Sequence, residues 1–125
     1  MEEGKGKKIL GVIGGMGPEA TSYFYENVIT HTKAQKDQDH LNMVILSHAD
    51  IPDRTEAIKS GESQRLIRML QEDARTLEKL GAANIAITCN TSHYYYDQIQ
   101  KAVSIPIINM IHESVAYAVR ELPDV

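Results

Sequence analysis

A lone cysteine stands at the most chemically informative position of the chain. Cys89 follows the strand-like residues 85–88 and precedes Asn90, Thr91 and Ser92, a polar run suited to the start of a helix. A thiol just before a helix N-terminus lies near the positive end of the helix dipole, which favours the reactive thiolate. A single cysteine is also often only a small buried apolar residue. Cys89 is therefore a candidate acid–base or nucleophilic group, with core packing as the alternative.

A glycine-rich turn is the second candidate. Residues 14–17 read Gly-Gly-Met-Gly and precede Pro18, which suits the first turn of a helix. Glycines allow a tight reversal, and the N–H groups at such a helix start can bind a phosphate or a carboxylate. The turn also matches the G-x-G-x-x-G/A pattern of dinucleotide-binding proteins. The acidic residue expected about 20 residues later is missing, because the next apolar run ends at Ser47 and His48.

Arg54 is the third candidate, in the segment Ile-Pro-Asp-Arg at residues 51–54. The planar guanidinium can clamp a carboxylate through two parallel hydrogen bonds, which a lysine cannot do. Most loop arginines make only a solvated ion pair, here with Asp53 or Glu56. From the residues alone, both interpretations of Arg54 stay open.

The elements that must position these residues alternate between strands and helices. Short apolar runs predict four buried strands, at residues 8–13, 42–46, 82–88 and 106–109. Apolar residues three or four positions apart predict four helices, at residues 18–29, 62–80, 94–103 and 113–122. Gly81 is placed to end the second helix. Residues 47–60 carry Pro52 and little periodicity, which predicts a long loop.

Apolar strands that alternate with helices are typical of a parallel sheet covered by helices on both faces. We therefore predict an α/β fold, a four-stranded, flavodoxin-like parallel sheet, in one domain that spans residues 8–125. Residues 1–7 are expected to form a flexible tail. Ligands of such sheets bind outside the carboxyl ends of the strands, which is where the glycine turn, Arg54 and Cys89 fall.

The composition limits the classes of function. The chain has 13 Lys+Arg and 17 Asp+Glu, a net charge of −4, and is 42% hydrophobic, as ordinary globular proteins are. An acidic chain without long basic runs argues against nucleic acid or an anionic membrane as a partner. One cysteine and five scattered histidines predict neither a disulfide nor a metal site. Without a signal peptide or an apolar run long enough to span a membrane, we expect a cytoplasmic protein.

Three motifs resemble the aspartate/glutamate racemase family, and within it the aspartate racemases. They are IGGMGPEAT at residues 13–21, IPDRT at residues 51–55 and TCNTSH at residues 88–93. The resemblance runs from Lys8 over essentially the whole chain and includes residues 105–111. It implies a racemase or epimerase without a cofactor, built from two similar α/β halves with the active site between them.

The resemblance also implies roles for individual residues. Cys89 matches the catalytic cysteine of the family's first half. Substrate-contacting positions of the family are matched by Met16, Arg54, Asn90, Thr91 and Ser92. Arg54 is then expected on the side-chain carboxylate of aspartate or a related dicarboxylic amino acid. The family's second half carries another catalytic cysteine, and we expect this C-terminal half to be missing from the chain.

Racemisation without a cofactor needs a base on one face of the α-carbon and an acid on the other. A thiolate and a thiol suit this chemistry, because each becomes the other after one turnover. Cys89 supplies one face only, so we expect the chain to be inactive alone and to self-associate as a homo-oligomer. We also expect the Cys89 sulfur to face a cleft open to solvent. A nucleotide-binding Rossmann-like domain and a catalytically silent α/β binding domain are the alternatives.

Overall fold

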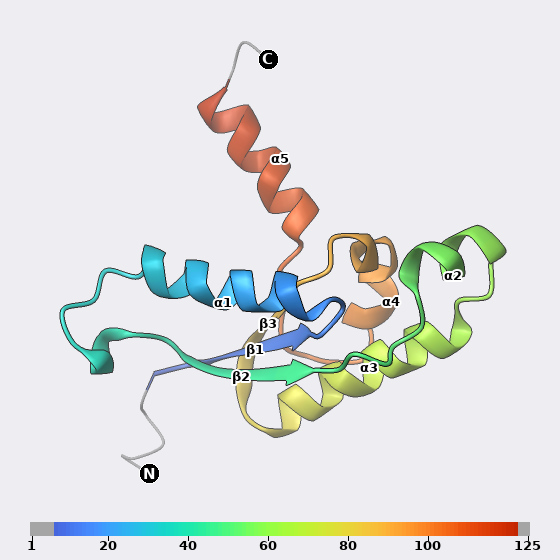
Figure 1. The fold of residues 1–125 in the computed structure, drawn as a ribbon, viewed down its shortest axis with the longest axis horizontal. Helices are drawn as coiled ribbons and strands as arrows, with labels where there is room; N and C mark the ends of the chain where they lie inside the picture. Colours follow the sequence, from blue (N-terminus) through green and yellow to red (C-terminus); the bar gives the residue numbers. More distant parts are fainter. Residues whose placement is uncertain (1–6, 123–125) are drawn as a thin grey trace.

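Three parallel strands form the centre of the structure, a computed structural model that describes residues 7–122. They are β1 (Ile9–Gly14), β2 (Asn42–Ser47) and β3 (Ala82–Ile87), in the spatial order β2-β1-β3. Both outer strands pair with β1 in parallel, so the three carboxyl ends meet at one edge of the sheet (Figure 1). The first three predicted strands are confirmed, with slightly shifted ends.

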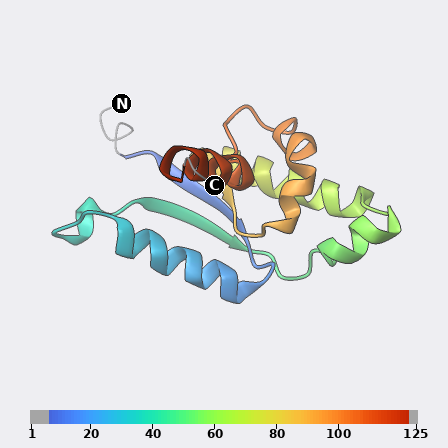
Figure 2. The same ribbon diagram turned by 90° about the horizontal axis from the view of Figure 1, so that it is seen from above.

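Helices lie on both faces of this sheet, as predicted. Figure 2 shows α1 (Pro18–His31) and α3 (Gln64–Lys79) on opposite sides of the strands. α3 packs against β1 and β3 through an apolar face of fully buried side chains, Leu66, Leu70, Ala74 and Leu77. Gly81 follows this helix with φ +93, a conformation that favours glycine, so its predicted role in ending the helix is confirmed.

The predicted fourth strand at residues 106–109 is wrong. Only Ile107 forms a bridge, parallel to Ile85 of β3. Pro106 has no N–H to donate, and the N–H of Ile107 donates at 2.9 Å to the Gln100 side chain instead of to a strand. Backbone pairing of residues 106–109 with β3 is limited to two hydrogen bonds, from the Ile85 N–H to the Pro106 carbonyl and from the Ile108 N–H to the Ile85 carbonyl, so the sheet has three strands among the described residues.

The predicted loop at residues 47–60 contains a helix, α2 (Arg54–Ser60). Asp53 caps its N-terminus by accepting a hydrogen bond from the Glu56 N–H at 2.8 Å. Gly61 ends the helix in the left-handed region, at φ +76. The spacing Asp-x-x-Glu is a capping pattern, so the sequence did contain the signal for this helix.

The segment after β3 also differs from the prediction. The helix expected at residues 94–103 begins earlier, as a short 3-10 helix η3 (Thr91–Tyr95), and continues as α4 (Tyr96–Gln100). A second 3-10 helix, η2 (Asp37–Asp39), precedes β2. Residues 1–6 and 123–125 lie outside the described residues, and with them most of the predicted N-terminal tail.

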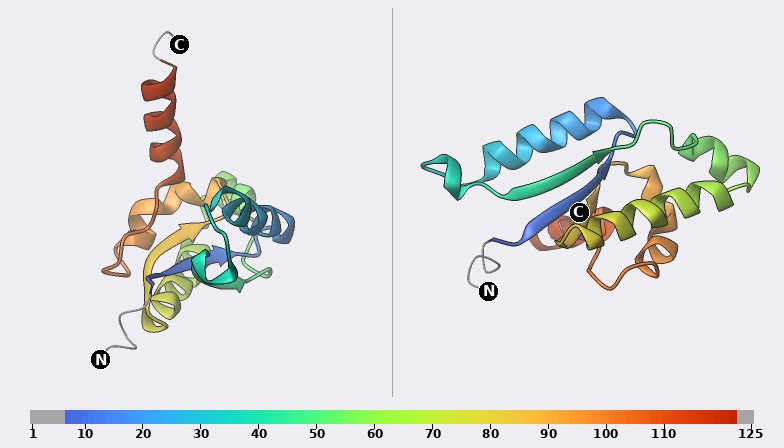
Figure 3. Two further views of the ribbon diagram at one scale, coloured as in Figure 1. Left: turned by 90° about the vertical axis from the view of Figure 1, so that its left-hand side faces the viewer. Right: turned by 90° about the horizontal axis from the view of Figure 1, so that it is seen from below.

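The last helix, α5 (Met110–Glu121), projects away from the sheet (Figures 1 and 3). None of its described residues is buried. Its apolar side chains are exposed, including Ile111, Val115, Tyr117 and Val119. Within residues 7–122, no helix combines the length and the apolar character needed to cross a membrane.

Candidate active site

The glycine turn after β1 packs directly onto the end of β2. Gly15 has φ +92, and a Cβ at this position would lie 2.3 Å from the backbone nitrogen of His48. Only glycine fits, because backbone atoms of a paired strand cannot move away from an added side chain. The His48 N–H also donates to the Gly14 carbonyl at 2.9 Å. The turn and the end of β2 therefore form one rigid unit.

Two buried threonines join this turn to the end of β3. The Thr21 hydroxyl oxygen accepts a hydrogen bond from the Gly15 N–H at 2.9 Å and lies 2.8 Å from the Thr88 hydroxyl. The Thr88 N–H donates to the Ile13 carbonyl at 3.1 Å. Because both side chains are buried and paired, the ends of β1 and β3 hold a single relative position.

Cys89 lies two residues beyond β3, in the buried cluster that also contains Met16. Ser92 is fully buried, and its hydroxyl donates to the Met16 sulfur at 3.8 Å. The structure therefore brings three of the predicted site residues together. We expected the sulfur of Cys89 to face an open cleft, but the residue is only 9% exposed and is buried in the core.

Asn90 and Thr91 follow the thiol at the surface of the protein. Both residues are exposed, and Asn90 is the N-cap of η3 without making a capping hydrogen bond through its side chain. Because η3 is a short 3-10 helix, few peptide dipoles are aligned behind Cys89, and their field is weaker than that of the predicted α-helix. The predicted contribution of a helix dipole at Cys89 is therefore small in this structure.

Arg54 is the first residue of α2 and is half-buried. Its Nη1 donates to the carbonyls of Ile51 and Pro52 at 3.4 Å each, which are long hydrogen bonds. Its Nε is buried and has no hydrogen-bond partner within residues 7–122. Ile51 belongs to the same buried cluster as Met16 and Cys89. The hydrogen bonds of Arg54 thus stay within its own segment, and among the described residues they reach none of the other predicted site residues.

His93 is a site residue that the sequence analysis did not select. Its Nδ1 lies 2.9 Å from the Cys89 carbonyl, which can only accept, so Nδ1 carries the hydrogen. In the neutral ring, Nε2 is then an acceptor, and it is buried without a partner among the described residues. The spacing of four residues between Cys89 and His93 fits one helical turn and was the available signal. The ring fixes the turn that carries the thiol.

A charged cluster lies behind the end of β2. His48 Nδ1 is 2.8 Å from Asp73 of α3, and His48 Nε2 is 2.9 Å from Asp50. The hydrogen bond with Asp73 is the main cause that raises the pKa of His48. Burial raises the pKa of the Asp73 carboxyl and outweighs the opposite effect of His48. In the sequence, the signal was a carboxylate on the otherwise apolar face of the helix, three residues after Leu70.

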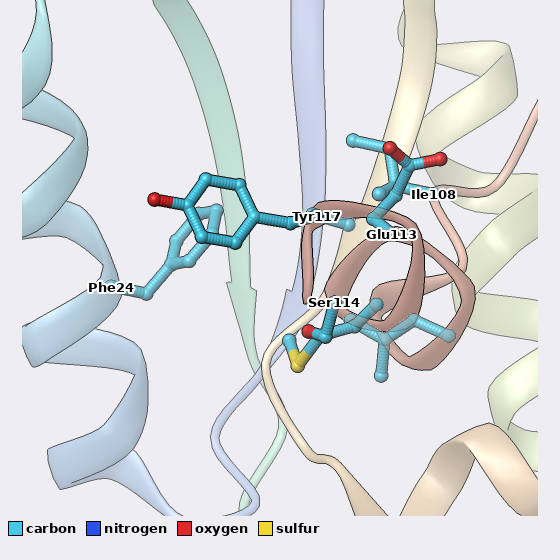
Figure 4. Close-up of a pocket in the computed structure, with 8 residues that line it drawn as sticks. Phe24, Ile108, Glu113, Ser114 and Tyr117 are labelled. Carbon is cyan, nitrogen blue, oxygen red and sulfur yellow. The ribbon is translucent and has the colours of Figure 1, made fainter. Parts of the chain in front are cut away.

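An apolar pocket of about 410 Å³ lies beside the carboxyl end of β3, where Ala86 and Ile87 line it. It is formed between α1, β3 and α5, and Figure 4 shows the Tyr117 side chain extending from α5 toward Phe24. None of the predicted site residues lines it. The lining of this pocket is therefore distinct from the strand-end site, although both lie near the end of β3.

The fold and the site define an α/β domain with a thiol-centred site at the carboxyl edge of a parallel sheet. The sequence model of the Asp/Glu/Hydantoin racemase family matches residues 13–124. The chain therefore belongs to this family, as the motifs predicted. Family membership favours a racemase site over the nucleotide-binding alternative.

Individual relatives support the same assignment. The chain is 33% identical over 119 residues to the broad specificity amino-acid racemase RacX of Bacillus subtilis, covering 92% of this chain and 49% of RacX. The structure matches Picrophilus torridus aspartate racemase with a TM-score of 0.85 at 32% identity, over 92% of this chain and 48% of that one. An aspartate racemase homologue from Pyrococcus horikoshii OT3 matches with a TM-score of 0.77 at 27% identity, over 93% and 50% of the two chains. The chain spans about half the length of these relatives.

Proposed function

We propose that the protein is a cofactor-independent amino-acid racemase that interconverts L- and D-aspartate, with Cys89 as the acid–base group on one face of the substrate. The observation that carries the proposal is the placement of Cys89 with Met16 and Ser92 at the carboxyl edge of the sheet in a chain of this family. Aspartate is the first substrate to test, because the Picrophilus neighbour is an aspartate racemase. RacX has broad specificity, so glutamate belongs in the same panel.

The chemistry requires a base pressed against a weakly acidic Cα–H and groups that stabilise the charge that develops on the carboxylate. The Gly15 N–H cannot serve, because it already donates to Thr21. The exposed side chains of Asn90 and Thr91 and the half-buried guanidinium of Arg54 are candidate donors. Arg54 then clamps one carboxylate, while Asn90 and Thr91 bind the other.

The opposite face of the substrate needs a second acid–base group. Cys89 is the only cysteine among the 125 residues. We infer that the second thiol comes from a C-terminal half, for which the relatives have the length, or from a second copy of the chain. The chain alone then removes and returns the α-proton on one face without inverting the substrate.

An experiment in deuterated water distinguishes exchange of the α-proton on one face from inversion of the substrate. We expect L-aspartate incubated with the 125-residue chain to gain α-deuterium by NMR while chiral chromatography detects no D-aspartate. Cys89→Ser should slow the exchange by at least about 10²-fold, the usual contribution of a positioned acid–base group. Thr30→Ser, an exposed substitution on α1, is the matched control. Exchange at the wild-type rate in Cys89→Ser would exclude Cys89 as the base, and an absence of exchange in the wild type would favour a silent binding domain.

A further inference from the structure

His48 stands at a junction of three parts of the site. Its backbone N–H donates to the Gly14 carbonyl at the glycine turn, and its side chain reaches Asp73 on α3. The segment that follows His48 contains Asp50 and Ile51 and leads to Arg54 at the start of α2. The position of His48 therefore affects Arg54 through the short segment that connects them.

Both nitrogens of the His48 ring face carboxylates. Nδ1 lies 3.1 and 2.8 Å from the two oxygens of Asp73, and Nε2 lies 2.9 Å from an oxygen of Asp50. An ionised carboxylate only accepts hydrogen bonds, so both contacts are hydrogen bonds only when the ring is an imidazolium. The two contacts thus fit an imidazolium between two ionised carboxylates, which bridges the loop before α2 to α3.

The two contacts differ in burial. The Asp73 side chain is 12% exposed and that of Asp50 is 85% exposed, with the His48 ring between them at 31%. Glu72, beside Asp73 on α3, is the other acidic group that acts on this carboxyl. A neutral ring has one N–H, which stays on Nδ1 and donates to the more buried Asp73. The Nε2 lone pair then faces the negative charge of Asp50, so the ring and this carboxylate repel each other.

We propose that protonated His48 is a positioning residue that ties residues 48–53 to α3 and thereby holds Arg54 in place for a substrate carboxylate. When the ring loses its proton, the contact with Asp50 is lost while the contact with Asp73 remains, and residues 50–53 are then anchored by Ile51 in the core and by the Asp53 cap. The substrate part of this inference rests on the proposed function; the structural part does not.

Hydrogen exchange measures the structural part without substrate. In the wild type, we expect protection of the His48 amide, which donates to the Gly14 carbonyl, to fall about tenfold between about pH 6 and about pH 9 after correction for the intrinsic exchange rate, as one charge-assisted bond is lost. His48→Gln should show the lower protection at both pH values. Asp50→Asn should show high protection at both, because its amide can donate to a neutral ring and accept from a charged one.

His31→Gln, at an exposed histidine of α1, is the control and should behave as the wild type. Protection that is independent of pH in the wild type, or that falls equally in Asp50→Asn, would overturn the proposal. Should His48→Gln fail to fold, the comparison of wild type with Asp50→Asn still decides the matter.

Aspartate affinity measures the substrate part. We expect the dissociation constant to rise about tenfold with pH in the wild type and to stay constant in Asp50→Asn, whereas His48→Gln binds weakly throughout. If the dissociation constant did not change with pH while hydrogen exchange changed as expected, His48 would have only a structural role, and the proposed positioning of Arg54 would be wrong. If the wild type binds neither aspartate nor glutamate at either pH, the proposed function fails, and the exchange result alone decides whether His48 ties the segment.

Discussion

Replacing Thr21 by valine tests whether buried hydroxyl pairing holds the strand ends together. The change keeps the size and branching of the side chain and removes only the hydroxyl. That hydroxyl accepts from the Gly15 N–H and pairs with Thr88, in a side chain that is 6% exposed. The lost hydrogen bond with Thr88 is worth about 1 kcal/mol, and the buried Gly15 N–H left without a partner costs about 1–3 kcal/mol. We therefore expect Thr21→Val to lower the free energy of unfolding by about 3 kcal/mol.

Urea unfolding followed by far-UV circular dichroism measures this loss. With a slope of about 2 kcal/mol per molar urea, the midpoint should fall by about 1.5 M without a change in slope. Thr21→Ser keeps the hydroxyl and loses a methyl group, so it should cost less than Thr21→Val. Thr30→Val, at an exposed threonine of the same helix, should change stability by no more than about 0.5 kcal/mol. If valine at position 21 proved as stable as the wild type, or more stable than serine, apolar packing and not hydroxyl pairing would hold this junction.

Three further outcomes follow from other contacts. Gly15→Ala should destabilise the protein far more than Gly61→Ala, since both residues have positive φ but only the Cβ at position 15 would meet backbone atoms; equal losses in urea unfolding would contradict this. The folded-state pKa of His48 is raised, so the stability that His48 contributes is fully present below its unfolded-state pKa and is lost as pH rises through its folded-state pKa. If the urea midpoint declined equally in His48→Gln, another group would be responsible for the decline. Wild-type protein should self-associate in sedimentation equilibrium and Val119→Lys should not, because Val119 is 68% exposed on the apolar face of α5; a monomeric wild type would refute this.

Much of the fold could be predicted because buried strands and helices have characteristic spacings of apolar residues in the sequence. The three strands are short apolar runs, and α3 repeats its apolar residues at the helical period up to Gly81. α2 was missed because seven residues leave too little periodicity, although Asp53 and Glu56 mark its start. The prediction of a fourth strand was wrong because it gave the apolar run more weight than Pro106, which lacks a donor, and because the hydrogen bond from Ile107 to the Gln100 side chain depends on the folded structure.

The site could be predicted only in part. Residues that follow parallel strands must meet at one edge, which is why Cys89 and Met16 were correctly expected together. The pairing of His48 with Asp73 spans 25 residues and depends on how α3 lies against the sheet, which no local pattern encodes. The covering of the thiol depends likewise on tertiary packing, and so does the buried Nε2 of His93.

The two edges of the sheet differ in how open they are to other strands. Along β3, the bridge at Ile107 covers part of the outer edge, and the Gln100 side chain in turn bonds to Ile107. β2 ends the sheet on the other side, without a further strand among the described residues, and its six residues include no charge and no proline. Unpaired strand edges of this kind are where strands of other molecules add, and charges or prolines normally discourage it. Aggregation of partly unfolded copies should therefore begin along residues 42–47, and a lysine placed on the exposed side of β2 should suppress it.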